Sequence, residues 1–170
     1  MKQVILRALE PSDIDIIYRW ENDPSIWEHS VTHLPFSRHL LTQYLMENTD
    51  NDIYVSKQLR LVAEDADSHT AVGCVDLFDF DPYHRRAGLG LLVDSRLRGQ
   101  GYGQATLNAL VPFCHERLQL HQLHCIVSTH NTASLHTFQQ CGFQPHGTLP
   151  HWLHTPQGWV DAVFLSLILE

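Results

Sequence analysis

Ala87–Gly103, with the sequence AGLGLLVDSRLRGQGYG, is the stretch that decides the fold of this 170-residue chain. It begins as an apolar strand over 87–93, in which Leu89, Leu91 and Val93 share one face. A basic turn with three glycines in five residues follows, and a helix begins there. Glycines at such a turn permit positive φ angles and let another group approach the backbone closely. The stretch therefore predicts a strand, a ligand-binding turn and a helix.

The turn is suited to a phosphate or pyrophosphate. The first N–H groups of a helix have no partner within it, and the helix dipole adds positive charge at that end. Arg96 and Arg98 add two cationic side chains. A Walker A loop is excluded because Gly-Lys-Ser/Thr is missing, and a dinucleotide fingerprint is excluded because Thr106 stands where its third glycine belongs. The pattern that remains is Arg98-x-x-Gly101-x-Gly103.

A second unit of the same kind follows later in the chain, at Leu123–Phe143. It opens with a short apolar run rich in residues that favour strands. Asn131 or Thr132 can then cap a helix that ends at Cys141-Gly142, where glycine supplies the left-handed stop.

Both units resemble landmarks of the GNAT family of N-acetyltransferases. The first resembles the family's acyl-CoA pyrophosphate loop, Q/R-x-x-G-x-G/A. The second resembles an Asn after the fifth strand followed by a helix that closes in a Gly-Phe pair. The resemblance implies one acetyltransferase domain over 1–170 with the α/β (α+β) acyl-CoA N-acyltransferase fold. We expect a mixed, mostly antiparallel sheet of about six or seven strands flanked by about four helices, with two parallel central strands that splay at the acyl-CoA site.

The rest of the chain predicts elements that fit this order. Strands are expected over 4–8, 59–64, 70–78, 87–93, 123–128, 143–148 and 162–169, and helices over 10–22, 37–47, 102–118 (kinked at Pro112) and 132–141. Loops are expected over 25–35 and 149–161.

The resemblance implies that acetyl-CoA binds as co-substrate along the central strand, the turn and the later helix. A backbone N–H within Leu91–Val93 is the expected donor to the oxyanion. The residues expected to contact acetyl-CoA are Leu91, Leu92, Val93, Arg98, Gly99, Gln100, Gly101, Tyr102, Gly103, Asn131 and Phe138.

The side chains that assist acyl transfer in the family are only partly present. Many relatives carry a Glu on the central strand, and the matching position, near Gly88, has no carboxylate. Phe138 stands where the polyamine acetyltransferase branch has a Tyr, and phenylalanine cannot donate a proton. Ser134, which matches the N-x-x-S of the ribosomal-protein N-acetyltransferase branch, is the acid candidate. The alternative is a residue of the first helical turn that faces solvent or bonds to the backbone. Asn131 is expected to hold the pantetheine or a water, to cap the helix, or both.

Asp76 is the predicted general base, because its neighbours Val75 and Leu77 face the other side of their strand. The alternative is an exposed strand residue.

Three residues of the first loop and its flanks join Asp76 as predicted substrate-binding residues: Glu21, Trp27 and Glu28. The alternatives are surface roles for the two glutamates and a buried loop anchor for the tryptophan.

Composition narrows the class of protein. A length of 170 residues fits one domain, and the net charge of −8 opposes nucleic acid as partner and suits a cationic amine. Four cysteines without CxxC spacing predict buried, reduced thiols in the cytoplasm, and no membrane span or signal peptide is expected. His121-x-x-His124 and His151-x-x-His154 lack a further ligand at a suitable spacing, so no metal site is expected.

The predicted function is acetyl-CoA-dependent N-acetylation of a primary amine on a small cationic acceptor, such as a polyamine or diamine. His84-Arg85-Arg86-Ala87, together with Asp76, Asp79 and Asp81, resembles the polyamine branch. Two alternatives stay open: acetylation of a protein N-terminus, and a non-catalytic acyl-CoA-binding module. For the oligomeric state, a homodimer is one open alternative.

Overall fold

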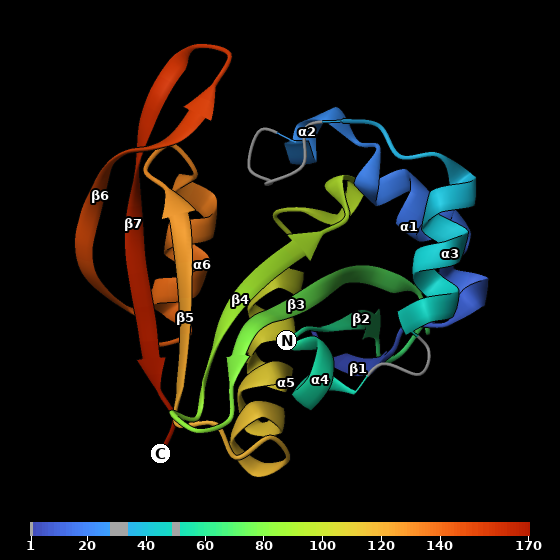
Figure 1. Ribbon diagram of the computed structural model, residues 1–170, viewed down its shortest axis with the longest axis horizontal. Coiled ribbons are helices and arrows are strands. Elements are labelled where there is room, and N and C mark those ends of the chain that lie inside the picture. Colours follow the sequence, from blue (N-terminus) through green and yellow to red (C-terminus); the bar gives the residue numbers. More distant parts are fainter. Residues whose placement is uncertain (1, 28–33, 49–51) are drawn as a thin grey trace.

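The computed structural model describes residues 2–27, 34–48 and 52–170. Its described strands form one seven-stranded sheet in the order β1-β2-β3-β4-β5-β7-β6 (Figure 1). The strands are β1 (Val4–Ala8), β2 (Leu59–Asp65), β3 (Ala71–Asp81), β4 (Arg86–Val93), β5 (Gln122–Ser128), β6 (Gln144–Thr155) and β7 (Gly158–Ile168). The described helices are α1 (Ile14–Glu21), α2 (Pro24–Trp27), α3 (Arg38–Asn48), α4 (Ile53–Ser56), α5 (Tyr102–Glu116) and α6 (Thr132–Gln140), with 3-10 turns η1 (Pro11–Asp13) and η2 (Ser95–Leu97).

The central strands β4 and β5 run parallel, and every other neighbouring pair is antiparallel. They pair only between Arg86–Gly88 and Gln122–His124, after which they diverge toward their carboxyl ends (Figure 1). The predicted parallel pair and its splay are therefore confirmed. Beyond Gly88, the edge of β4 that faces β5 has no strand partner among the described residues.

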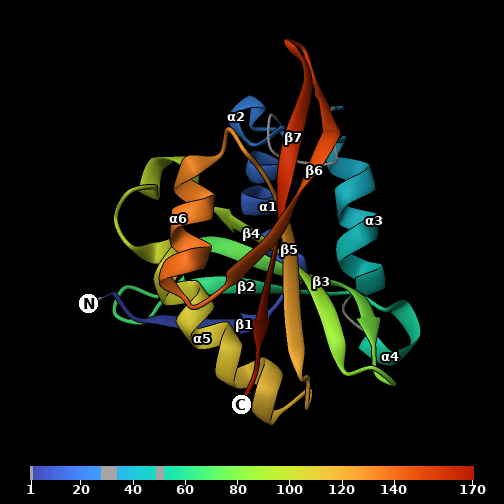
Figure 2. The same ribbon diagram turned by 90° about the vertical axis from the view of Figure 1, so that its left-hand side faces the viewer.

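Helices cover both faces of the sheet (Figure 2), and a hydrophobic core lies on each face. Helices α5 and α6 pack on one face against Val75 and Leu77 of β3, and helices α1 and α3 pack on the other against Cys74. Alternate side chains of one strand thus serve different cores, as the period of a strand requires. None of the described helices has the length and apolar character needed to cross a membrane.

The four predicted helices are present as α1, α3, α5 and α6, and two four-residue helices, α2 and α4, lie in regions with little periodicity. Two sequence-based expectations need correction. Residues 149–161 are no loop, because β6 and β7 continue through them to a turn at 156–157. Most of β6 is exposed and lacks an apolar face, so its sequence does not alternate as a half-buried strand does. Cys141 is half-buried, whereas the other three cysteines are buried.

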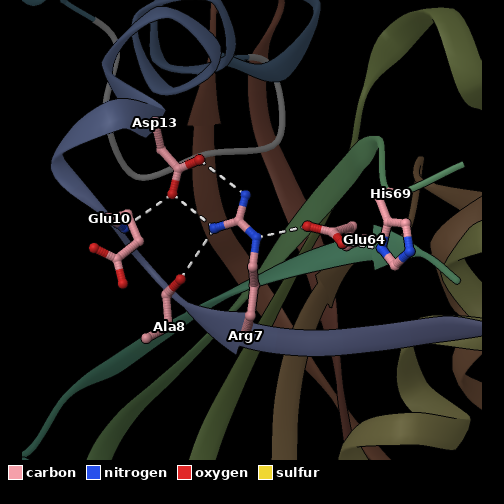
Figure 3. A network of polar contacts seen from close by, with 6 residues as sticks. All are labelled: Arg7, Ala8, Glu10, Asp13, Glu64 and His69. Carbon is pink, nitrogen blue, oxygen red and sulfur yellow. Dashed lines mark hydrogen bonds and ion pairs between the residues drawn. The ribbon is translucent and has the colours of Figure 1, made fainter.

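Arg7 fixes the start of α1 on the sheet (Figure 3). Its guanidinium donates to Asp13 at 2.8 and 2.9 Å and to Glu64 of β2 at 2.7 Å. Asp13 also accepts the backbone N–H of Glu10 at 2.9 Å, which closes the capping box of η1. This network ties η1, which precedes α1, to strands β1 and β2.

Candidate active site

The glycine turn between β4 and α5 has the backbone geometry that the sequence predicts. Gly99 and Gly101 have φ angles of +74° and +86°, and a Cβ atom at either position would meet nothing within 4 Å. Gly101 is the N-cap of α5 and offers no side chain to its first N–H groups. The turn therefore presents an open, partly positive helix start to a ligand.

Asp94 anchors the start of this turn to α1. Its buried carboxylate accepts hydrogen bonds from Arg19 at 2.7 Å, from the Trp20 indole at 2.9 Å and from Arg96 at 3.0 Å. The hydrogen bonds from Arg96, Trp20 and Arg19 outweigh burial and hold the pKa of Asp94 well below its usual range. The Arg96 guanidinium, which was expected to add charge at the turn, is thus paired with Asp94. Arg98 is exposed.

Tyr102 and Gly103 serve the packing of α5. The buried Tyr102 side chain donates its hydroxyl to Asp65 at 2.8 Å. A Cβ at Gly103 would lie 3.3 Å from Thr137 of α6 and 3.6 Å from Leu91. Tyr102 can therefore offer a ligand only its backbone, and Gly103 lets α5 approach α6 and β4 closely.

The splayed part of β4 is half-buried at Leu91, Leu92 and Val93. Leu91 packs toward α5 and α6, whereas Leu92 packs toward α1 and α3. The strand thus divides the site into two sides, which we call the donor side (α5 and α6) and the acceptor side (α1 and α3).

Helix α6 brings Asn131, Ser134 and Phe138 to the donor side. Asn131 is the N-cap, and its side-chain oxygen accepts the Ser134 N–H at 3.1 Å. Ser134 is half-buried. Phe138 is 3% exposed and packs edge to face on Phe143, with ring centroids 5.1 Å apart. The ring of Phe138 therefore belongs to the core that α5 and α6 cover.

Arg60 assembles the carboxylates of the acceptor side. It donates to Asp76 at 2.6 and 3.0 Å, and to Glu21 of α1 at 2.5 Å. Burial lowers the pKa of Arg60, but the Asp76 carboxylate and other neighbouring groups raise it more. Since both oxygens of Asp76 are engaged, uptake of a proton would cost one of these bonds. This geometry favours an electrostatic role for Asp76 over the predicted role as base.

Arg60 was not expected from the sequence, because one arginine in a strand carries no local signal of its partners. Trp27 donates its indole N–H to the Glu21 backbone oxygen at 2.7 Å and is half-buried, as a loop anchor would be. Glu28 lies outside the described residues. Within the described part of the chain, no three His, Cys, Asp or Glu residues gather closely enough to hold a metal ion.

A family model described as an acetyltransferase (GNAT) domain matches residues 3–144. The match covers well over half of the sequence, so the chain belongs to the GNAT family and is an N-acetyltransferase. The alternative of a non-catalytic module is thereby set aside.

Among known proteins, the chain is similar to the spermidine N(1)-acetyltransferase of Vibrio cholerae. The two are 26% identical over 147 residues, which cover 86% of this chain and 82% of the relative. A crystal structure of a Vibrio cholerae spermidine N-acetyltransferase with CoA and spermine superposes with a TM-score of 0.89, at 23% identity over 98% and 96% of the two chains. A dodecameric structure of the enzyme from that organism has a TM-score of 0.82, at 22% identity over 98% and 94% of the chains. At these identities the structures show the fold.

Proposed function

We propose that this protein transfers the acetyl group of acetyl-CoA to a primary amine of a polyamine. The observation that carries the proposal is the junction of the glycine turn with the gap between β4 and β5, since it joins an anion-binding helix start to an unpaired strand edge. The named relatives support the polyamine as acceptor.

The donor side supplies backbone groups for acetyl-CoA. The N–H groups from Gly99 to Gly103 would bind the pyrophosphate, and Arg98 would add charge. A backbone N–H within 91–93 would donate to the thioester carbonyl oxygen, where negative charge develops during attack. Ser134, or a water held by Asn131, would protonate the leaving thiolate.

The acceptor side supplies negative charge for a cationic amine. The group of Glu21, Arg60 and Asp76 carries two carboxylates and one guanidinium, so its net charge is −1 when all three are ionised. Asp79 and Asp81 add carboxylates near the end of β3. This excess of negative charge favours an ammonium-bearing substrate.

The test is acetylation of a panel of acceptors by the purified protein. Thiol release from acetyl-CoA would be measured with spermidine, a diamine, an N-terminal peptide and a neutral amino acid amide. We expect the highest kcat/KM with spermidine. A preference for the peptide would support the N-terminal alternative, and turnover of none of them would contradict the proposal.

Location and self-association complete the proposal. The free cysteines support a reducing compartment, and we place the enzyme in the cytoplasm. The dodecameric relative supports self-association of this chain, with a homodimer as the smallest unit. Light scattering coupled to gel filtration measures the mass and decides whether copies associate.

A further inference from the structure

A row of rings crosses the acceptor side at the point where β4 and β5 begin to diverge. The His124 ring of β5 stacks on Phe164 of β7 at 5.7 Å between centroids and meets Phe78 of β3 edge to face at 6.5 Å. His146 of β6 extends the row, 6.2 Å from Phe164. Gly88 of β4 makes room for it, since a Cβ there would lie 2.2 Å from the Phe78 ring.

His124 occupies a defined place in the gap. It pairs with Gly88, and this is the last pair of residues at which β4 and β5 are paired. Leu123 and Cys125 face the core of α5 and α6, so the His124 side chain points to the acceptor side. There it lines a cleft of about 440 Å³ together with Asp79, Asp81, Arg86, Gln122 and Phe164.

The surroundings favour the neutral form of the His124 ring. Burial lowers its pKa, Asp79 raises it and Arg86 lowers it, with a net fall. Of the other titratable groups nearby, Asp81 pairs with Arg86 at 3.4 Å, and His146 bonds to the Ser166 hydroxyl at 2.8 Å. Within the described residues, neither ring nitrogen of His124 has a hydrogen-bond partner, so one lone pair is available to a proton.

We infer that His124 accepts the proton of the attacking amine through one water molecule. The inference rests on the proposed acetyl transfer. Leu91 lies three residues beyond Gly88, about 10 Å along the strand. Two hydrogen bonds of about 3 Å each through one water and one nitrogen–carbon approach of about 3 Å add up to about 9 Å, which is close to this distance. The carboxylates of Glu21 and Asp76 are already engaged by Arg60, whereas His124 is not.

The proton and electron balance of the step is simple. The amine nitrogen bonds to the thioester carbonyl carbon, and the carbon–sulfur bond breaks with its electron pair leaving on sulfur. The proton lost by nitrogen passes to the water, which gives one of its own protons to the His124 imidazole. The thiolate takes a proton from the donor side, and the imidazolium later returns its proton to solvent.

The test compares His124→Gln with the parent in kcat, in the pH dependence of kcat/KM and in CoA affinity. We expect kcat to fall by about 100-fold or more, in line with the loss of a general base. The acid limb that titrates below the pKa of free histidine should disappear, and added imidazole should restore part of the rate. CoA affinity should not change. The exposed His121 provides the control, and His121→Gln should match the parent.

His124→Phe keeps a ring in the row and separates chemistry from packing. If it retains the parent rate, or if His124→Gln keeps both kcat and the acid limb, the inference is wrong. Circular dichroism confirms that each variant folds, and the phenylalanine variant serves if the glutamine variant does not. A parent that acetylates no amine contradicts the proposed function and the inference together. An active parent with an indifferent His124→Gln contradicts the inference alone.

Discussion

The donor side of β4 is built mainly from backbone, whereas the acceptor side is built from side chains. On the donor side, Gly99 and Gly101 hold positive φ angles and leave open space. On the acceptor side, Arg60 holds carboxylates of α1 and β3 in fixed positions. The two sides should therefore be sensitive to different substitutions. An added Cβ atom should impair the donor side, and a lost charge should impair the acceptor side.

Among the variants that compare the two sides, Gly101→Val is expected to have the largest effect. A β-branched residue at a φ of +86° is strained, and its side chain covers the N–H groups of the turn. We expect CoA affinity to fall by about 100-fold, which corresponds to about 2.7 kcal/mol. Isothermal titration calorimetry measures it.

Gly158→Val is the matched control, because Gly158 also has a positive φ and open space but is the first residue of β7, next to the β6–β7 turn. It should lose stability without losing CoA affinity. Equal CoA affinity in Gly101→Val and the parent would contradict the assignment of the turn.

Arg60→Met tests the acceptor side. Two carboxylates left without their cation stabilise the ammonium form of the amine, which cannot attack. We expect kcat for spermidine to fall by about tenfold, with KM equal or lower. Steady-state kinetics measures kcat and KM separately and so distinguishes this effect from a loss of substrate binding.

Arg7→Met is the control for this variant. Arg7 also bridges two carboxylates, Asp13 and Glu64, but lies away from the gap. It should lower the melting temperature and leave kcat unchanged. A loss of kcat as large as in Arg60→Met would show that the effect is general.

Ser134→Ala tests whether the donor side supplies an acid for the leaving thiolate. A thiolate is a moderate leaving group, with a thiol pKa near the ~8.5 of free cysteine, so the need for an acid is modest. We expect kcat to fall by a few tens-fold or less, and CoA affinity to stay nearly unchanged. Pre-steady-state and steady-state rates measure the effect. An unchanged kcat at every pH would exclude Ser134 from proton transfer.

Phe138→Tyr should have the smallest kinetic effect. The sequence alone favours a tolerated change that brings a hydroxyl toward the thioester sulfur. The burial of Phe138 against Phe143 now predicts a fall of about 1–2 kcal/mol in the free energy of unfolding, because the added hydroxyl lacks a partner there. Urea denaturation tests this. Unchanged stability with a raised kcat would instead place the hydroxyl at the reacting sulfur.

The comparison of the two sides also explains what the sequence could predict. The turn at 98–103 is made of consecutive residues, so its glycines alone predict the strand-turn-helix unit. The same pattern predicts the parallel pair of strands around it. Arg60 and His124 carry no such signal, since their partners come from other strands and from α1. The sequence also fails to predict the full length of the β6–β7 hairpin. The exposed strand β6 is held by pairing with β7 and has no apolar pattern of its own.

The most direct test of this division is the CoA affinity of Arg60→Met beside that of Gly101→Val. Calorimetric titration of both variants and the parent gives three dissociation constants under one condition. If the donor and acceptor sides are separate, Arg60→Met should bind CoA within about twofold of the parent, a difference of about 0.4 kcal/mol, while Gly101→Val binds far more weakly. Equal weakening in both variants would contradict the account.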